Sequence, residues 1–158
     1  MYERILVAVD GSSTSKLGLE EAVKLARQPQ SRLLIVHVVD QLMPYTDPVG
    51  AAYFGDLVSL MRESGRAVIK EAEDWARQHG VEPETAMEEV VGAAAAEVIV
   101  KQATQWRADL IVLGTHGRRG VKRMVMGSDA EAVVRTTPVP VLLVRTRPSR
   151  GKAKDDGR

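Results

Sequence analysis

Short apolar runs alternate with longer amphipathic segments along this chain. The first two runs, residues 4–9 and 32–39, are dominated by Val, Ile and Leu, which is typical of strands buried on both faces of a parallel sheet. The segments between the runs place apolar residues at helical spacing. The pattern therefore predicts an α/β fold, an open, doubly wound parallel sheet of five strands. We expect strands over 4–9, 32–39, 85–91, 110–113 and 139–145, and helices over about 13–28, 56–79, 93–106 and 128–136.

Three segments stand out from this alternation. Pro and Gly residues between positions 40 and 55 predict an irregular connection, either a lid over a pocket or a partner surface. The pair Glu88 and Glu89 predicts that the third strand lies at a sheet edge, where one side meets water. From residue 147 the chain is polar and carries Pro and Gly, so we expect one domain over 1–146 and a disordered tail over 147–158.

The composition narrows the class of protein. The 158 residues include 22 Lys and Arg against 21 Asp and Glu, so no overall field favours a nucleic acid or an acidic membrane. Aromatic residues make up 4%, too few for a base-stacking surface, and the absence of Cys excludes thiol catalysis and disulfides. With no leader-like start and no apolar run of about 20 residues, we expect a cytoplasmic protein that binds neither nucleic acid nor membrane.

A glycine-bearing loop follows the apolar run Asp109–Leu113. It begins Gly-Thr-His-Gly at Gly114, continues for nine residues and ends at Gly127 and Ser128. Glycines at a strand-to-helix turn let backbone N–H groups approach an anion, and the following helix N-terminus adds positive potential. Three glycines can also be simple turn chemistry, but the basic residues inside the loop favour a phosphate site. These basic residues are Arg118, Arg119, Lys122 and Arg123.

Several side chains have both a structural and a ligand-binding interpretation. Ser128 and Glu131 match the pattern of a helix-capping box, but the Ser128 hydroxyl and backbone N–H would equally suit a phosphate oxygen. Asp10 ends the first strand, where it would cap the next helix, stabilise the turn at Gly11, or bind a ribose hydroxyl, an adenine amine or a divalent cation. We expect His116 to be a loop residue and His37 to be a hydrogen-bonded core residue.

The glycine-bearing loop has no evident general base beside it. It holds no carboxylate, and the chain shows no Ser-His-Asp or paired-carboxylate arrangement. Nucleotide binding is therefore favoured over turnover.

Ligands of a doubly wound sheet bind where the winding reverses, outside the carboxyl ends of the strands. The loops after the first and fourth strands would meet there if those two strands are neighbours.

The chain resembles the universal stress proteins over residues 1 to about 145. Five segments carry the resemblance: ILVAVDGS, LLIVHVVD, VVGAAAAEVIV, ADLIVLGTHGRRG and GSDAEAVVRTTPVPVLLV. It implies the strand order 3-2-1-4-5 of the adenine nucleotide alpha hydrolase-like fold. It also implies the ATP-binding branch of the family, because the three loop glycines and the following Ser are present. By position, the residues expected to bind the nucleotide are Ala8, Val9, Asp10, Val38, Leu113, Gly114, His116, Gly117, Arg118, Gly127, Ser128 and Asp129.

The implied roles divide along the nucleotide. Residues 8–10 and Val38 would line adenine and ribose, and the loop glycines with Ser128 would hold ribose and phosphates. Asp129 departs from the family pattern, which often has an apolar residue there. Its charge suits a helix N-terminus but would repel a terminal phosphate unless a divalent cation such as Mg²⁺ intervenes. Ala130 lacks a hydroxyl that some relatives offer, so the preference among ATP, ADP and AMP stays open.

The resemblance also implies a homodimer. The apolar segment Val139–Arg145 would form an open sheet edge that a second copy would cover, although a helix or the tail would serve as well. The expected function is a stress-response regulator or sensor that binds ATP, with slow hydrolysis at most. The alternative is a dimeric interaction module without nucleotide. A nucleotidyltransferase-like enzyme is disfavoured because no second histidine accompanies His116.

Overall fold

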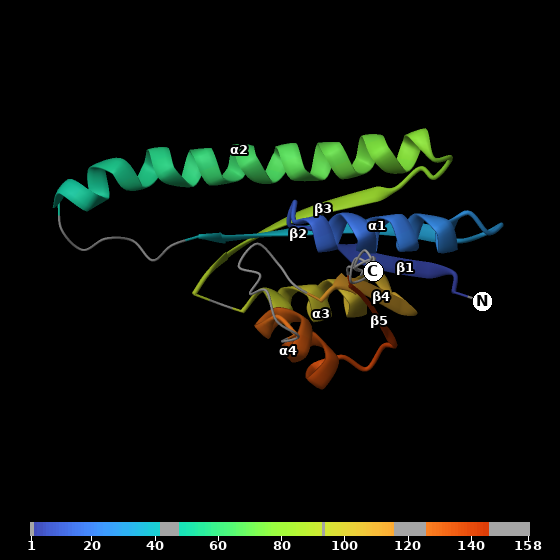
Figure 1. Ribbon diagram of the computed structural model, residues 1–158. Helices are drawn as coiled ribbons and strands as arrows, with labels where there is room; N and C mark the ends of the chain where they lie inside the picture. The colour runs from blue at the N-terminus through green and yellow to red at the C-terminus, as the bar shows by residue number, and fades with distance from the viewer. Residues whose placement is uncertain (1, 42–47, 93, 116–125, 146–158) are drawn as a thin grey trace, which may run out of the picture.

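The computed structural model describes residues 2–41, 48–92, 94–115 and 126–145. Within these ranges, strands and helices alternate as the hydrophobic pattern predicts (Figure 1). The strands are β1 (Arg4–Ala8), β2 (Arg32–Gln41), β3 (Glu84–Val91), β4 (Leu110–Gly114) and β5 (Val141–Val144). The helices are α1 (Ser13–Ala26), α2 (Pro48–Gln78), α3 (Ala95–Trp106) and α4 (Ser128–Thr136).

The described strands form one parallel sheet in the order β3-β2-β1-β4-β5. This confirms the predicted order and the neighbour relation of β1 and β4. In the register of the sheet, Val7 of β1 lies opposite Ile35 of β2 and Val112 of β4. The chain winds outward from β1 in both directions, so the winding reverses between β1 and β4. A crevice at the carboxyl ends of these two strands is the expected ligand position in such a sheet.

Two apolar cores lie on opposite faces of the sheet. Helices α1 and α2 cover one face, and α3 and α4 cover the other (Figure 1). Side chains alternate between the faces along each strand: Ile5 and Val7 of β1 enter the α1/α2 core, and Leu6 enters the α3/α4 core. All three are fully buried. This alternation decides which core, and therefore which side of the crevice, each strand-end residue faces.

The connection between β2 and α2 differs from the prediction. The irregular segment expected over 40–55 is wrong in part, because β2 continues to Gln41 and α2 already begins at Pro48. Proline suits the first position of a helix, where its missing N–H would have had no intrahelical acceptor. Gly55 lies inside the helix, where a glycine costs roughly 1 kcal/mol relative to Ala without breaking it. Residues 42–47 lie outside the described residues.

The ends of the elements follow recognisable backbone signals. Gly80 ends α2 with φ of +82°, and its N–H donates to the Arg77 carbonyl at 3.0 Å, which confirms the predicted stop. Strand β5 is shorter than the predicted 139–145, because Pro140 has no N–H for the ladder and pairing starts at Val141. The predicted tail over 147–158 lies outside the described residues and stays a prediction.

Candidate functional site

Helix α1 crosses the end of β4 at very close range. A Cβ added to Gly114 would lie 2.7 Å from the carbonyl carbon of Thr14 and 2.9 Å from the amide nitrogen of Ser15. Both contacts are with backbone atoms, which cannot swing aside. Gly114 is therefore required for close packing between α1 and β4, in addition to the ligand role that its place in the loop predicts. The crossing brings the β1–α1 turn against the start of the glycine-bearing loop.

The β1–α1 turn is held by its own polar side chains. A carboxylate oxygen of Asp10 accepts a hydrogen bond from the Ser12 N–H at 2.9 Å, across Gly11 with φ of +80°. This confirms the turn-stabilising interpretation of Asp10, and its ligand role stays a prediction. The Ser12 hydroxyl caps α1 by accepting from the Ser15 N–H at 3.2 Å. Sequence reasoning missed this cap, although Ser just before an apolar helical pattern is its usual signal.

The N-terminus of α4 has no side-chain cap, which corrects the capping-box prediction. Ser128 is the first helical residue, and the cap position belongs to Gly127, whose backbone is extended (φ −60°, ψ 147°). The Gly127 N–H donates to the Thr115 carbonyl at 2.8 Å, and its own carbonyl accepts from the Glu131 N–H at 3.0 Å. The first-turn amides of Ser128 and Asp129 have no intrahelical acceptor, as at any helix start. They are the N–H donors that an anion at this helix end would use.

The nucleotide-binding residues predicted at the strand ends divide between the two faces of the sheet. Ala8, Val38 and Leu113 lie on the α3/α4 side, and Ala8 and Val38 are half-buried. Val9 instead packs into the α1/α2 core and is 6% exposed. Its N–H donates to the Val36 carbonyl at 2.9 Å, and its carbonyl lies 2.7 Å from Nδ1 of His37. The last contact confirms that His37 is a hydrogen-bonded core residue.

The middle of the glycine-bearing loop lies outside the described residues. The predictions for His116, Gly117 and Arg118 fall there, as do those for Arg119, Lys122 and Arg123. At the end of the loop, Ser128 and Asp129 are exposed in the first turn of α4. The structure therefore brings together the β1 end, Val38, the β4 end and the α4 start, and the loop between them keeps its predicted role as a hypothesis.

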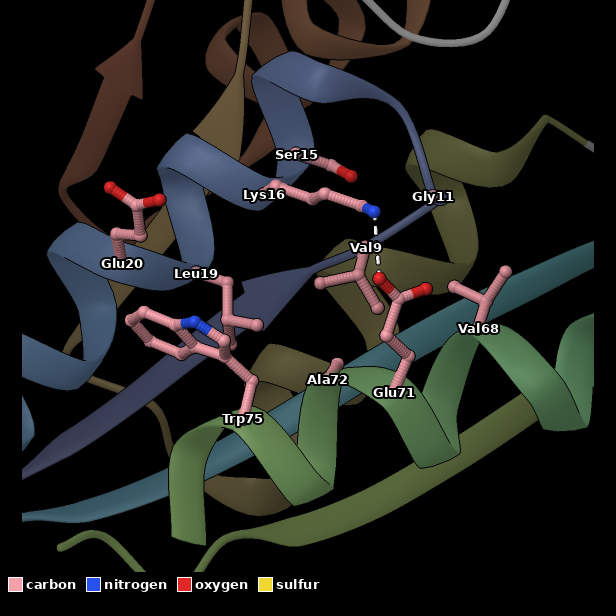
Figure 2. Close-up of a pocket in the computed structure, with 10 residues that line it drawn as sticks. All are labelled: Val9, Gly11, Ser15, Lys16, Leu19, Glu20, Val68, Glu71, Ala72 and Trp75. Carbon is pink, nitrogen blue, oxygen red and sulfur yellow. Dashed lines mark hydrogen bonds and ion pairs between the residues drawn. The ribbon is translucent and has the colours of Figure 1, made fainter. Parts of the chain in front are cut away.

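A small hollow between α1 and α2 lies on the other face of the sheet (Figure 2). Val9, Leu19 and Trp75 line it, and the ion pair between Lys16 and Glu71, at 2.7 Å, spans it. Its volume of about 100 Å³ is well below the roughly 300 Å³ or more of typical ligand pockets. Ala8 and Val38 face away from it, so Val9 is the one predicted nucleotide-binding residue among the described ones that lines this hollow.

The carboxyl ends of β2 and β3 carry an ion pair with α2. Arg62 donates to both carboxylate oxygens of Glu89, at 2.7 and 2.8 Å, and the Gln41 amide donates to the same carboxylate. These hydrogen bonds, first those from Arg62, and the Arg62 charge hold the pKa of Glu89 below its ordinary value. Strand β3 is a sheet edge as predicted. Glu89 is nonetheless a paired group, where the sequence suggested a solvated one.

The described ranges hold neither a metal cluster nor a bilayer-spanning helix. These ranges contain no cluster of three or more His, Asp or Glu side chains that could hold a metal ion. No described helix combines the length and the apolar composition that crossing a bilayer requires.

Comparisons with known proteins agree with this architecture. The model of the universal stress protein family matches residues 1–145. A universal stress protein of Methanocaldococcus jannaschii is 32% identical over 145 residues, 92% of this chain and 83% of that protein. Among solved structures, UspA from Lactobacillus plantarum superposes with a TM-score of 0.76 at 28% identity, covering 91% of this chain and 98% of that one.

A second solved structure is a universal stress protein in complex with cAMP. It superposes with a TM-score of 0.65 at 27% identity, covering 92% of this chain and 99% of that one. The strand order and these neighbours identify the adenine nucleotide alpha hydrolase-like fold. With a family model across nearly the whole chain and a relative above 30% identity, the chain belongs to the universal stress protein family.

Proposed function

We propose that this chain binds an adenine nucleotide at the crevice between the carboxyl ends of β1 and β4, as a stress-response sensor with little or no turnover. The adenine and ribose would lie against Ala8 and Val38, on the α3/α4 side of the sheet. The phosphates would lie at Gly114, Gly127 and the start of α4. In this proposal the nucleotide state is the signal, and a partner protein reads it.

The observation that carries the proposal is the N-terminus of α4. Its cap residue is Gly127, which has no side chain to satisfy the first-turn amides. Helix α1, on the other face of the sheet, is capped by its own Ser12. The α4 start thus offers backbone donors and a positive helix end at the point where a doubly wound sheet binds ligands.

The family supplies independent support for the ligand class. The relative solved with cAMP shares 27% identity over 92% of this chain. An adenine base with a phosphate is also the chemistry that apolar strand ends beside the first-turn amides of α4 would bind. The described residues show no metal cluster, so magnesium would enter with ATP, bridging its phosphates and offsetting repulsion by Asp129.

Isothermal titration calorimetry with ATP, ADP and AMP tests the proposal. We expect binding of all three, with magnesium increasing the affinity for ATP more than that for AMP because AMP lacks the terminal phosphates. GTP is the matched control for the base. Absence of heat with every adenine nucleotide, together with no co-purified nucleotide in mass spectra of the protein, would leave a nucleotide-free dimeric interaction module as the function.

Two substitutions at one position isolate the α4 amide. Ser128→Pro removes the first-turn N–H, and the helix tolerates proline at its first residue. The extended backbone of Gly127 (ψ 147°) is also what a residue before proline requires. Ser128→Ala keeps the N–H and removes the hydroxyl. We expect Ser128→Pro to weaken nucleotide binding roughly tenfold, as for a hydrogen bond to a charged group, and to weaken it more than Ser128→Ala does.

We also propose a dimer and a cytoplasmic location, which nucleotide titration does not test. The first is a homodimer formed through the edge segment Val139–Arg145, whose central residue Leu142 is 36% exposed. The second is the cytoplasmic location expected from the sequence, which cell fractionation tests. Slow hydrolysis, if any, would be measured as phosphate release from ATP.

A further inference from the structure

His37 links the carboxyl end of β1 to helix α2 on the α1/α2 side of the sheet. Three polar side chains are buried among the described residues, and two of them, Thr14 and Ser15, belong to the first turn of α1. His37 is the third, at 5% exposure, and its Nδ1 lies 2.7 Å from the Val9 carbonyl oxygen. Because a carbonyl oxygen only accepts, the contact assigns the proton to Nδ1, which donates.

This hydrogen bond acts at the point where the chain leaves β1. The Val9 N–H donates to the Val36 carbonyl, and the His37 ring donates to the carbonyl of Val9 itself. Both polar backbone groups of Val9 are therefore hydrogen-bonded. The next N–H, of Asp10, lies 3.3 Å from the Ser15 hydroxyl oxygen, and the turn through Gly11 follows. The orientation of the Val9 carbonyl therefore sets where the β1–α1 turn begins.

The position of the ring is fixed from its other side by α2 and β3. A Cβ added to Gly65 of α2 would lie 3.0 Å from Cδ2 of His37 and 3.2 Å from Sδ of Met87 on β3. The ring thus fills the space between strand and helix, with its Nδ1–H directed at Val9. A closely packed core allows few alternative positions for such a ring.

We propose that His37 is a positioning residue for nucleotide binding. By holding the Val9 carbonyl, it places the backbone of residues 8–11 along the crevice, without contacting the ligand itself. The inference rests on the proposed function, because the position of this backbone affects binding only if a nucleotide occupies the crevice. Loss of the Nδ1–H would leave a buried carbonyl unpaired, and the turn would shift to find another donor.

Two amide variants test the placement of the donor with little change in polarity. In His37→Asn, the side-chain nitrogen is separated from Cβ by the same number of bonds as Nδ1, so the donor is kept. In His37→Gln, the nitrogen lies one bond farther and misses Val9. We expect His37→Gln and His37→Leu to weaken ATP and AMP binding roughly tenfold, the effect of one hydrogen bond. His37→Asn should stay within about threefold of the wild type.

A stability-matched control separates positioning from general destabilisation. Leu33→Val removes a methylene from a fully packed site at the opposite end of β2, where Leu33 is 1% exposed. It should lower the melting temperature yet leave nucleotide affinity unchanged. If nucleotide affinity followed melting temperature across all four variants, or if Asn and Gln behaved alike, the positioning role would be wrong.

Nuclear magnetic resonance gives a readout that does not need the ligand. Long-range ¹H–¹⁵N spectra should place the His37 ring proton on Nδ1, and His37→Gln should shift the amide resonances of Asp10, Gly11 and Ser12. A proton on Nε2, or unmoved turn amides, would overturn the inference even if ATP binds. If these spectra behave as expected but no adenine nucleotide binds the wild type, the proposed function fails and His37 is left as a determinant of the turn alone.

Discussion

At the scale of single residues, the close packing of α1 against the end of β4 depends on the absence of a side chain at Gly114. Its position in a glycine-bearing loop suggests a ligand role, but the Thr14 and Ser15 backbone also lies where its Cβ would be. We expect Gly114→Ala to destabilise the protein by roughly 1–3 kcal/mol, the range for inserting a methyl group into a packed site. Urea denaturation, with the midpoint and the slope compared to wild type, measures this.

Gly55 is the matched control for Gly114→Ala. It lies inside α2, and a Cβ there would meet no atom within 4 Å. Gly55→Ala should therefore stabilise the protein by roughly 0.5–1 kcal/mol through helix propensity alone. Equal effects of the two substitutions would show that α1 does not cross β4 as closely as the structure has it.

At the scale of elements, two serines beside the crevice have opposite roles at their helix starts. Ser12 caps α1 with its side chain, and Ser128 is the first helical residue of α4, one position past the cap residue Gly127. We expect Ser12→Ala to lower the free energy of unfolding by about 1 kcal/mol and Ser128→Ala to change it by less than about 0.5 kcal/mol. Thermal unfolding by circular dichroism gives both values. A large cost at Ser128 would restore the capping box.

The Arg62–Glu89 pair predicts a local pH dependence at the end of the β2–β3 pair. Hydrogen bonds from Arg62 lower the pKa of Glu89, so the pair stabilises the folded state above the unfolded pKa, about 4.3. That contribution is lost as pH falls through the depressed folded value. In Arg62→Gln we expect the Glu89 pKa to rise toward its ordinary range, measured by ¹³C side-chain titration. An unchanged titration would mean that Arg62 does not hold Glu89 in solution.

Sequence patterns predicted the elements well where the evidence is local. Continuous apolar runs and helical spacing sufficed for the elements and most of their boundaries, because buried strands and amphipathic helices differ in their apolar pattern. The strand order was predicted from the family resemblance, and the sheet confirms it. The start of α2 was missed because Pro48 is a breaker in most contexts and tolerated only at a helix's first position. The caps were misassigned because Ser12 and Ser128 both precede helical patterns, and only the backbone angles separate them.

The candidate site was predictable only in outline. Alternation along β1 separates Val9 from Ala8, and applying it to the site residues would have placed them on opposite faces. The contact between His37 and Val9, 28 positions apart, depends on the parallel register of β1 and β2 and has no local signal. The same holds for the crossing of Thr14 over Gly114. Such contacts follow from tertiary packing, which residue spacing alone does not determine.

At the scale of the whole molecule, the two edges of the sheet are protected differently. Edge β3 carries Glu84, Glu88 and Glu89, and Arg32 and Arg62 form ion pairs with Glu84 and Glu89. Charged side chains on an edge strand disfavour pairing with another strand. Edge β5 has the sequence Val-Leu-Leu-Val, and within the described residues β4 is its one strand neighbour. An apolar open edge of this kind favours pairing with a second copy of itself. Two-fold symmetry would then bring the same strand of each copy together.

We therefore expect the protein to form a dimer, and we expect this dimer to dissociate when a charged residue is introduced on β5. Leu142→Lys should give a monomer, because two like charges would face each other across a two-fold axis and each would lose solvation. Leu60→Lys is the control, since Leu60 is 62% exposed on α2, away from β5. Light scattering after size-exclusion chromatography measures both masses. A monomeric wild type would contradict the dimer itself. A Leu142→Lys dimer beside a Leu60→Lys monomer would assign the interface to α2, because the edge argument requires the charge to act at β5 alone.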